Sequence, residues 1–351
     1  MDAPAEFPSY PVLQALVQKS VRVRYLSTSA RDGSGTTVSG VVFVPNGDPP
    51  EGGWPIAAIG HPTAGINSSC APSAYPGLMG NLSAIIPFLT YGFVVVMPDY
   101  QGLGTPGPHP YLDPKTEGYN VIDAVRAGRQ VVPDASDVWV SYGVSQGGQA
   151  VWAANEMAAD YGRGLRLAGS ISIAAPTDLR PLVDAMVAGT LTTSQKVLLP
   201  LVLKGLQVAH PELHIEDYLH GAMFTRIDVF LACAGDKEGL KSLVAEAAPP
   251  TDTMPIDARA ADRLRGWLGE FSLPQRPASA PMLVAYGDVD QTVLPAWTQE
   301  SVRRACEMGD VIDLHVAPGQ GHGTLDLGGI PVNWVKDRLA GAPPPNTCAP
   351  V

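Results

Sequence analysis

Charged residues are scarce in this sequence, and it contains no long hydrophobic run. Charged residues make up 16% and hydrophobic residues 45% of the 351 positions, which is the composition of a folded, rather apolar protein. The longest apolar stretch, residues 197–203, is interrupted by Pro200 and is far shorter than the about 20 residues that a membrane span needs. The sequence therefore predicts one large folded unit, with or without an insertion, and no stable membrane span.

Basic residues are outnumbered by acidic ones. The chain has 34 acidic and 23 basic residues, a net charge of −11, and no basic cluster. This balance argues against nucleic acid and anionic membranes as partners, and we expect a monomer.

Residues 1–6 have neither the basic start nor the apolar centre of a signal peptide. We therefore expect either a cytosolic protein or a secreted one whose signal peptide is not part of this sequence.

Cysteine is rare, and no two of the four cysteines have the close spacing of a metal site. Three pairings are possible, of which we favour Cys70–Cys233 and Cys306–Cys348. The second pair would fasten the proline-rich tail, residues 342–351, to the body of the protein and stabilise it by roughly 4 kcal/mol. Four reduced, buried thiols remain the alternative.

Glycine and proline together make up about a fifth of the chain, less than the about 25–30% typical of disorder, so we interpret them as loop residues. Among these loops lie runs of β character. The first two alternate in polarity and predict an antiparallel hairpin, whereas the later ones are continuously apolar, as in parallel strands covered on both faces. The eight runs are residues 21–27, 37–44, 55–60, 93–97, 137–142, 167–174, 281–286 and 311–316.

Helical patterns alternate with these strands at residues 79–89, 118–131, 149–161, 295–307 and 331–339. Such alternation predicts an α/β fold with an eight-stranded, mostly parallel sheet. About a hundred residues after the sixth strand are helical and proline-containing, with no clear strand. We therefore expect an α/β core formed by residues 1–175 and 280–351, and a helical cap, residues 176–279, inserted over the carboxyl ends of the strands.

The most informative motif is Gly143-x-Ser145-x-Gly147, which lies between a strand and a helix. A strand that turns at once into a helix forces a strained backbone on its middle residue and lifts that side chain clear of the sheet. The glycines leave room for the turn. Ser145 is therefore the candidate nucleophile.

A serine nucleophile needs a histidine base and an orienting carboxylate, which follow it in the order acid, then histidine. His322 lies in a glycine-rich loop just after the last strand and is the candidate base. Two aspartates, Asp288 and Asp290, follow the seventh strand. We choose Asp290 as the acid, because Asp288 has the position of a turn-forming residue.

When a serine attacks a carbonyl carbon, the carbonyl oxygen becomes an oxyanion that two backbone N–H groups must stabilise. One belongs to the residue after the nucleophile and the other to the loop after the third strand. The first is Gln146. In the second loop Pro62 has no N–H, which leaves Thr63 or Ala64; we favour Thr63. His61 is interpreted as holding this loop by hydrogen bonds.

The remaining histidines predict no further chemistry. His315 is interpreted as structural, and three histidines in the cap are expected at the surface, namely His210, His214 and His220. No cluster of metal-ligating residues is apparent, and no Gly-x-Gly-x-x-Gly motif for a dinucleotide. We expect no cofactor.

Taken together, several segments resemble the secretory lipase family, the lipase-A-type branch of the α/β-hydrolases. They are residues 60–63 (GHPT), 70–73 (CAPS), 98–104 (PDYQGLG), 123–127 (DAVRA) and 143–148 (GVSQGG), and the likeness covers residues 41–175 and 281–324. The resemblance implies a secreted, cofactor-free serine hydrolase of carboxylic esters, with a helical cap that shapes an acyl pocket. It also implies a disulfide from Cys70 to the cap cysteine, Cys233. The family has His-Gly where this chain has His61-Pro62.

We therefore expect a lipase or esterase that works through an acyl-enzyme, with a small-molecule or lipid ester as substrate. Apolar cap residues would line an acyl pocket or fill the cap core, namely Leu198, Leu199, Leu201 and Val202. Asp99 and Tyr100 are interpreted as structural. A peptidase or amidase with the same three side chains is the alternative. A binding module without activity is disfavoured because none of the three is missing.

Overall fold

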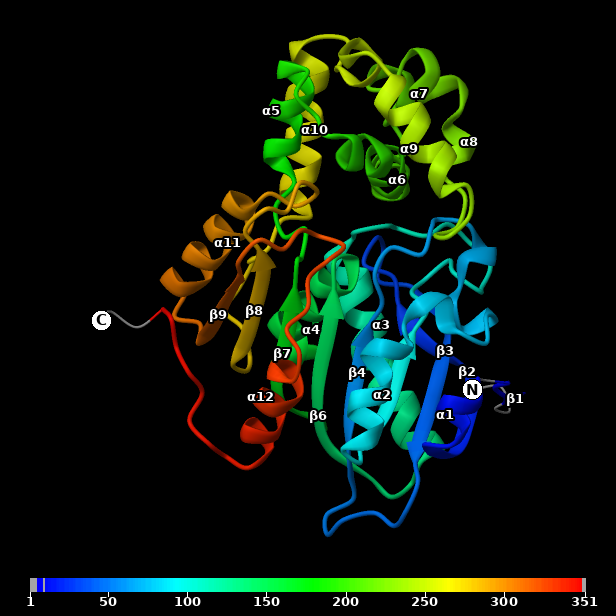
Figure 1. Ribbon diagram of the computed structural model, residues 1–351, viewed down its shortest axis with the longest axis vertical. Coiled ribbons are helices and arrows are strands. Elements are labelled where there is room, and N and C mark those ends of the chain that lie inside the picture. The colour runs from blue at the N-terminus through cyan, green and yellow to red at the C-terminus, as the bar shows by residue number, and fades with distance from the viewer. Residues whose placement is uncertain (1–4, 9, 349–351) are drawn as a thin grey trace.

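The computed structural model describes residues 5–8 and 10–348, so the expectations for residues 1–4 and for the tail residues 349–351 lie outside the described chain. The described strands form one sheet in the order β1-β2-β3-β5-β4-β6-β7-β8-β9, with a group of helices above it (Figure 1). The strands are β1 (Ala5–Glu6), β2 (Val17–Thr28), β3 (Gly35–Pro45), β4 (Trp54–Gly60), β5 (Val94–Pro98), β6 (Ala135–Val144), β7 (Arg166–Ile173), β8 (Met282–Gly287) and β9 (Ile312–Ala317).

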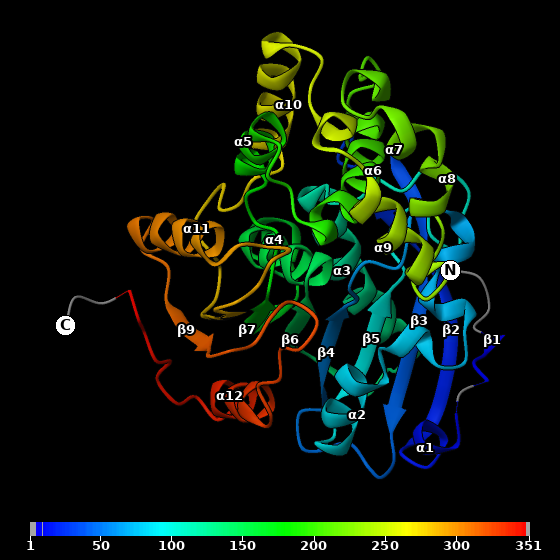
Figure 2. The ribbon, with the colours of Figure 1, turned by 45° about the horizontal axis from the view of Figure 1, so that its top comes forward.

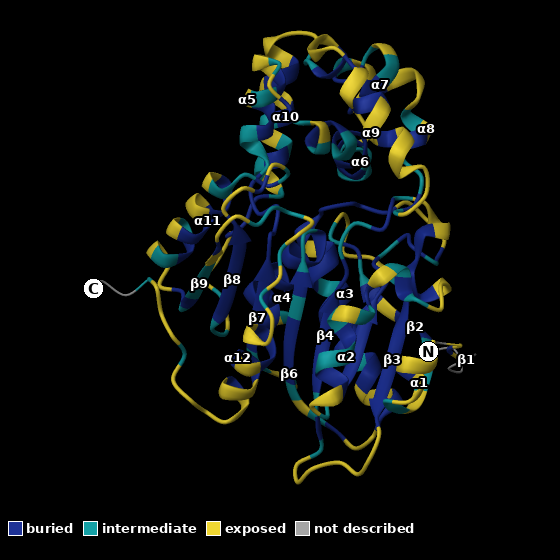
Figure 3. Ribbon diagram, in the orientation of Figure 1, coloured by how far each residue is buried: buried dark blue, intermediate teal, exposed yellow. Residues whose placement is uncertain are grey.

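The predicted α/β fold with an eight-stranded, mostly parallel sheet is confirmed, with one addition. A two-residue strand, β1, extends the edge by pairing antiparallel with β2. β2 and β3 form the predicted antiparallel hairpin, and β4, β5, β6, β7, β8 and β9 are mutually parallel. β5 is buried at every position, and so is β8 (Figure 3), as their continuous apolar sequences require.

Helices cover both faces of the sheet and enclose two cores. On one face α1 (Pro11–Gln14), α2 (Leu82–Thr90) and α12 (Ile330–Leu339) pack on the sheet through residues such as Leu13, Phe88 and Val335. On the other face lie α3 (Pro114–Val131), α4 (Gln146–Tyr161) and α11 (Pro295–Glu307), packed through residues such as Val121, Trp152 and Val302. The α/β core is therefore a three-layer unit.

The segment between β7 and β8 folds as helices above the carboxyl ends of the strands (Figure 2). Its hydrophobic cluster includes Leu203, Tyr218 and Leu264, and continues into the α/β core through Tyr111 and Trp297. These helices lie within the residues that the sequence predicts as a cap, and we use that name for them. They are α5 (Arg180–Ala188), α6 (Thr193–Ala209), α7 (Gly221–Thr225), α8 (Ile227–Phe230), α9 (Glu238–Ala247) and α10 (Ala258–Glu270).

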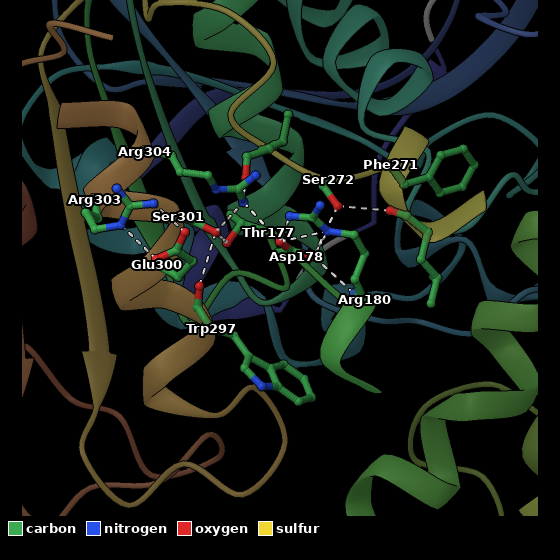
Figure 4. Close-up of polar contacts among 12 residues, drawn as sticks. Thr177, Asp178, Arg180, Phe271, Ser272, Trp297, Glu300, Ser301, Arg303 and Arg304 are labelled. Carbon is green, nitrogen blue, oxygen red and sulfur yellow. Dashed lines mark hydrogen bonds and ion pairs between the residues drawn. The ribbon is translucent and has the colours of Figure 1, made fainter. Parts of the chain in front are cut away.

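The two connections between core and cap meet at α11 (Figure 4). The N–H of Leu273, on the returning connection, donates to the carbonyl of Thr177 on the outgoing one at 2.7 Å. The Arg304 guanidinium of α11 bonds Asp178 at 3.1 Å and the Leu273 carbonyl at 2.8 Å. Burial alone would raise the pKa of Asp178, but its bonds to arginine lower it below the ordinary value. Both ends of the cap are thus fixed at one place on the core.

Two disulfides join the same cysteines that the sequence analysis pairs. Cys70–Cys233 links the loop after β4 to the cap over a sequence separation of 163, and Cys306–Cys348 fastens the segment after α12 to α11 over a separation of 42. In the part of the chain that the structure describes, none of the helices combines the length and the apolar content needed to cross a membrane.

Candidate active site

Ser145 lies in the sharp turn between β6 and α4. Its backbone has φ 55° and ψ −122°, a conformation that non-glycine residues rarely adopt, and its N–H donates to the Ile173 carbonyl at 2.8 Å. A β-carbon on Gly147 would overlap the carbonyl oxygen of Gly60, and one on Gly143 would overlap that of Gly147. Both glycines are therefore required for the close approach that presents the Ser145 side chain.

The structure brings Ser145, His322 and Asp290 together. His322 Nε2 lies 2.9 Å from Ser145 Oγ, and His322 Nδ1 lies 2.8 Å from Asp290 Oδ2. Because an ionised carboxylate only accepts hydrogen bonds, Nδ1 carries the proton and Nε2 accepts from the serine hydroxyl. Asp290 is fully buried, and its Oδ1 accepts the N–H groups of Thr292 at 2.7 Å and Val293 at 3.0 Å. The arrangement can activate the serine as a nucleophile.

Asp288, the competing aspartate, is exposed and does another task. Its Oδ1 accepts the N–H of Gly319 at 2.6 Å, which ties the loop after β8 to the loop that carries His322. Asp290 therefore bonds the His322 side chain, whereas Asp288 bonds the backbone of the loop that carries His322.

The two expected oxyanion donors belong to segments that adjoin Ser145. Gly60, at the end of β4, is paired with Gly143, so the loop that follows β4 begins beside the nucleophile turn. Thr63 in this loop lines the same cavity as Ser145, and its hydroxyl is 2.7 Å from the Tyr111 hydroxyl. The Gln146 amide belongs to the first turn of α4, where backbone N–H groups have no intrahelical acceptor.

The sequence analysis missed the buried side chains behind Gln146. The Gln146 side-chain amide donates to Glu117 Oε1 at 2.7 Å and to His109 Nε2 at 3.0 Å, and His109 Nδ1 donates to the Gln101 carbonyl at 2.8 Å. Burial raises the pKa of Glu117 well above its ordinary value and lowers the pKa of His109 to about 3. Burial thus favours the neutral form of both groups, and they hold Gln146 through hydrogen bonds.

A sequence signal for Glu117 did exist. Glu117 lies one turn before Val121 on the stripe of α3 that continues through Val125 and Gly128, all of them buried. A carboxylic acid on the apolar stripe of a helix is buried at a cost in free energy unless it is hydrogen-bonded, so its position indicates a buried hydrogen-bond partner.

Other residues singled out in the sequence have contacts that fit structural roles. Asp99, just after β5, accepts the Ser39 hydroxyl of β3 at 2.6 Å and the Ser73 N–H at 2.8 Å, which fastens the loop at Ser73 to the sheet. The His61 ring contacts the Pro62 and Asp99 carbonyls at 2.7 and 3.2 Å, within the loop it was expected to hold. His315 lies on β9, 3.1 Å from Asp313.

A cavity of about 1010 Å³ opens at Ser145 and His322. On the cap side it is bordered by α6, through Ser194, Val197 and Leu198, and by the loop after β8, through Gln291. A second, much smaller cavity of about 30 Å³ lies beneath the cap and also reaches Ser145. Among the residues that the structure describes, no group of three or more His, Cys, Asp or Glu side chains could hold a metal ion.

One family model matches the part of the chain that contains the Ser145 turn. Residues 79–226, which include the Ser145 turn, match the model of the family described as Secretory lipase. A search of curated proteins gives no match. Many solved structures share the fold, however.

Candida antarctica lipase A in its closed state has a TM-score of 0.78 at 16% identity, over 100% of this chain and 84% of that one. A putative hydrolase from Legionella pneumophila has a TM-score of 0.72 at 19% identity, over 94% and 92% of the two chains. A variant of the rice cell wall degrading esterase LipA from Xanthomonas oryzae has a TM-score of 0.71 at 20% identity, over 92% and 89%.

At these identities the structural likeness establishes the α/β-hydrolase fold, and the family match adds the activity class. The family and the two disulfides also indicate an extracellular protein. The resemblance to the secretory lipases is therefore confirmed, and the chain is an enzyme of the carboxylic ester hydrolase class.

Proposed function

We propose that the protein is a secreted serine hydrolase that cleaves a small-molecule or lipid carboxylic ester through an acyl-enzyme on Ser145. The observation that carries this proposal is the pair of hydrogen bonds from Ser145 through His322 to buried Asp290. We call these three residues the triad. Each of them lies in a loop at the carboxyl end of a strand, where sheets of this kind bind ligands.

The triad geometry supports a two-step reaction. Ser145 Oγ attacks the ester carbonyl while its proton passes to His322 Nε2, and Asp290 stabilises the imidazolium that forms. The amides of Gln146 and Thr63 stabilise the oxyanion. The intermediate then collapses, and His322 returns the proton to the departing alcohol.

Hydrolysis completes the cycle. A water molecule gives its proton to His322 and attacks the acyl carbonyl, which releases the carboxylic acid and restores the Ser145 hydroxyl. The Nδ1–H bond to Asp290 keeps His322 in the tautomer that both steps require.

Turnover of p-nitrophenyl esters from acetate to palmitate, with Ser145→Ala as the comparison, tests the function. We expect a loss of about 10⁴-fold or more in kcat, because the variant retains only binding and the oxyanion donors. An unchanged melting temperature of the variant serves as the folding control. Turnover that survives the substitution would reject the proposal, and turnover of an aminoacyl anilide without turnover of any ester would replace it with an amidase.

A further inference from the structure

Two side-chain hydroxyls close to the nucleophile share a single hydrogen bond. Thr63 Oγ1 lies 2.7 Å from the Tyr111 hydroxyl oxygen. Each hydroxyl carries one hydrogen and can donate once. Among the residues that the structure describes, neither hydroxyl has another hydrogen-bond partner. One of the two hydrogens is therefore left without an acceptor in the protein.

The chemistry of the two hydroxyls decides which hydrogen this is. A phenol is a stronger acid than an alcohol, so Tyr111 is the better donor and the Thr63 oxygen is the better acceptor. Tyr111 is buried, and burial raises the pKa of its hydroxyl above the ordinary value, so Tyr111 keeps the proton that it donates. The free hydrogen is then that of Thr63. A hydroxyl that accepts one hydrogen bond also donates a stronger one.

The pair of hydroxyls borders the same two cavities as the nucleophile. Ser145 lines both the large cavity and the small one beneath the cap, whereas Thr63 lines the first and Tyr111 lines the second. The loop that carries Thr63 is also fixed against the nucleophile turn, because the His61 carbonyl oxygen lies only 2.9 Å from where a β-carbon on Gly147 would stand. The Thr63 side chain is thus held beside the turn that presents the serine.

The backbone of Thr63 has an unused donor as well. Its N–H has no acceptor among the described residues. Ala64, the other candidate for the second oxyanion donor, does not line the large cavity, and its carbonyl accepts the Ala234 N–H of the cap. Thr63 therefore offers two hydrogens without an acceptor, one on its backbone nitrogen and one on its side-chain oxygen. Fixed donors of this kind stabilise a negative charge that develops in the reaction.

We infer that the Thr63 side-chain hydroxyl is a third donor to the oxyanion, and that Tyr111 is the positioning residue that orients it. When Ser145 Oγ bonds the ester carbon, its proton passes to His322 and an electron pair of the carbonyl moves to the carbonyl oxygen. That oxygen accepts the N–H of Gln146 together with the N–H and the hydroxyl of Thr63, and the threonine keeps its proton. The inference rests on the proposed function and adds one catalytic hydroxyl to it.

Substitutions of Thr63 test the donor, with p-nitrophenyl butyrate as substrate. Thr63→Val keeps the shape and the backbone N–H but loses the hydroxyl. Its kcat should fall about 10²-fold with KM unchanged, because the lost bond forms only in the transition state. Thr63→Ser keeps the hydroxyl and should stay close to the wild-type protein. Thr193→Val, at another threonine that lines the cavity, is the matched control and should leave kcat unchanged.

A double-mutant cycle separates orientation by Tyr111 from a merely structural role. Tyr111→Phe should lower kcat about fivefold, the effect of one ordinary hydrogen bond. In the Thr63→Val background it should have no further effect on kcat, because the hydroxyl that it orients is already gone. Tyr142→Phe, at a partly buried tyrosine of the same cavity, is the control and should leave kcat unchanged. The melting temperature of each variant shows that it is folded.

An alkyl trifluoromethyl ketone gives a readout that needs no turnover, since its adduct with Ser145 carries an oxyanion. Its dissociation constant should rise in Thr63→Val by the factor by which kcat falls.

Four results would overturn the inference: wild-type kcat in Thr63→Val, an equal loss in Thr63→Ser, an unchanged dissociation constant of the ketone, or a Tyr111→Phe effect that is the same in both backgrounds. Failure of the proposed function is distinguishable, because the wild-type protein would then hydrolyse no ester, or Ser145→Ala would leave its turnover intact.

Discussion

The two sides of the Ser145 site are built in different ways. The triad side consists of three loops, each of which carries its functional residue within a short local motif. On the oxyanion side, the Gln146 side chain is held by Glu117 and His109 of the segment before β6. The Thr63 loop is held by the cap, because the Ala234 N–H donates to the Ala64 carbonyl at 2.8 Å and Cys233 bonds Cys70.

The triad side is thus specified by short local motifs, whereas the oxyanion side is specified by contacts between distant segments. The loops that carry Asp290 and His322 are bonded to each other, as by Asp288 and Gly319. The oxyanion side depends instead on contacts with Leu112, Tyr111 and Cys233 from other parts of the chain. We therefore expect substitutions at the triad to act on chemistry alone, and substitutions behind the oxyanion donors to act on chemistry and stability together.

The largest expected change is in kcat, and it should distinguish Asp290 of the triad from the neighbouring Asp288. Asp290→Asn should lower kcat by up to about 10⁴-fold, because an amide facing Nδ1 favours the wrong tautomer of His322. Asp288→Asn is the matched control two residues away and should change kcat by less than about tenfold, since it loses one loop hydrogen bond. Steady-state kinetics with p-nitrophenyl butyrate gives both values. Inactivation by the Asp288 substitution alone would reverse the assignment.

The second largest effect should distinguish the two disulfides. From their sequence separations of 163 and 42, loop closure predicts losses of about 5 and about 4 kcal/mol when each is replaced by alanines. Loss of Cys70–Cys233 should also lower kcat, by up to about 10²-fold, the effect of losing one oxyanion donor.

The Cys306–Cys348 pair is the control for this experiment, because neither cysteine lines the cavity. Its removal should lower stability and leave kcat as in the wild-type protein. Kinetics at a temperature where both double variants are folded, with urea unfolding for stability, separates the effects. Equal kcat values for the two double variants would show that the cap does not position the Thr63 loop.

The smallest effect concerns the buried acid behind Gln146. Because burial raises the pKa of Glu117, the native state keeps a proton that the unfolded state releases above the ordinary glutamate pKa of about 4.3. The wild-type protein therefore loses stability through this group as the pH rises from that value, by up to about 1.4 kcal/mol per pH unit. Glu117→Gln is uncharged at every pH and lacks this loss.

Urea unfolding of the two proteins at pH 5 and pH 8 measures this effect. The free energy of unfolding of the Gln variant, relative to that of the wild type, should be larger at pH 8 than at pH 5. The same difference at both values would mean that Glu117 is ionised in the native protein.

The sequence allowed all eight long strands and the three triad candidates to be placed, because strand patterns and glycine-rich turns depend on neighbouring residues. Helix starts were less accurate. The helix predicted from residue 149 begins at Gln146, since Gly147 and Gly148 have low helix propensity. The helix predicted from residue 118 begins at Pro114, although Asp113 followed by proline is a helix-start signal.

What the sequence could not provide are the contacts between distant segments. Nothing local relates His109 to Gln146, and the partial exposure of Tyr142 depends on how α2 and α12 pack. The two-residue strand β1 is too short to give a pattern. These features depend on tertiary packing, which cannot be predicted from local patterns in one amino-acid sequence.

The central claim, that Ser145 is the nucleophile and His322 its base, is tested most directly by covalent labelling. Treatment with diisopropyl fluorophosphate followed by peptide mapping should find one phosphoryl group per chain, on Ser145, with loss of esterase activity in proportion to the label. His322→Ala should be labelled far more slowly, because its serine has no base. Full esterase activity with Ser145 completely labelled, or inactivation with the label on another residue, would contradict the account.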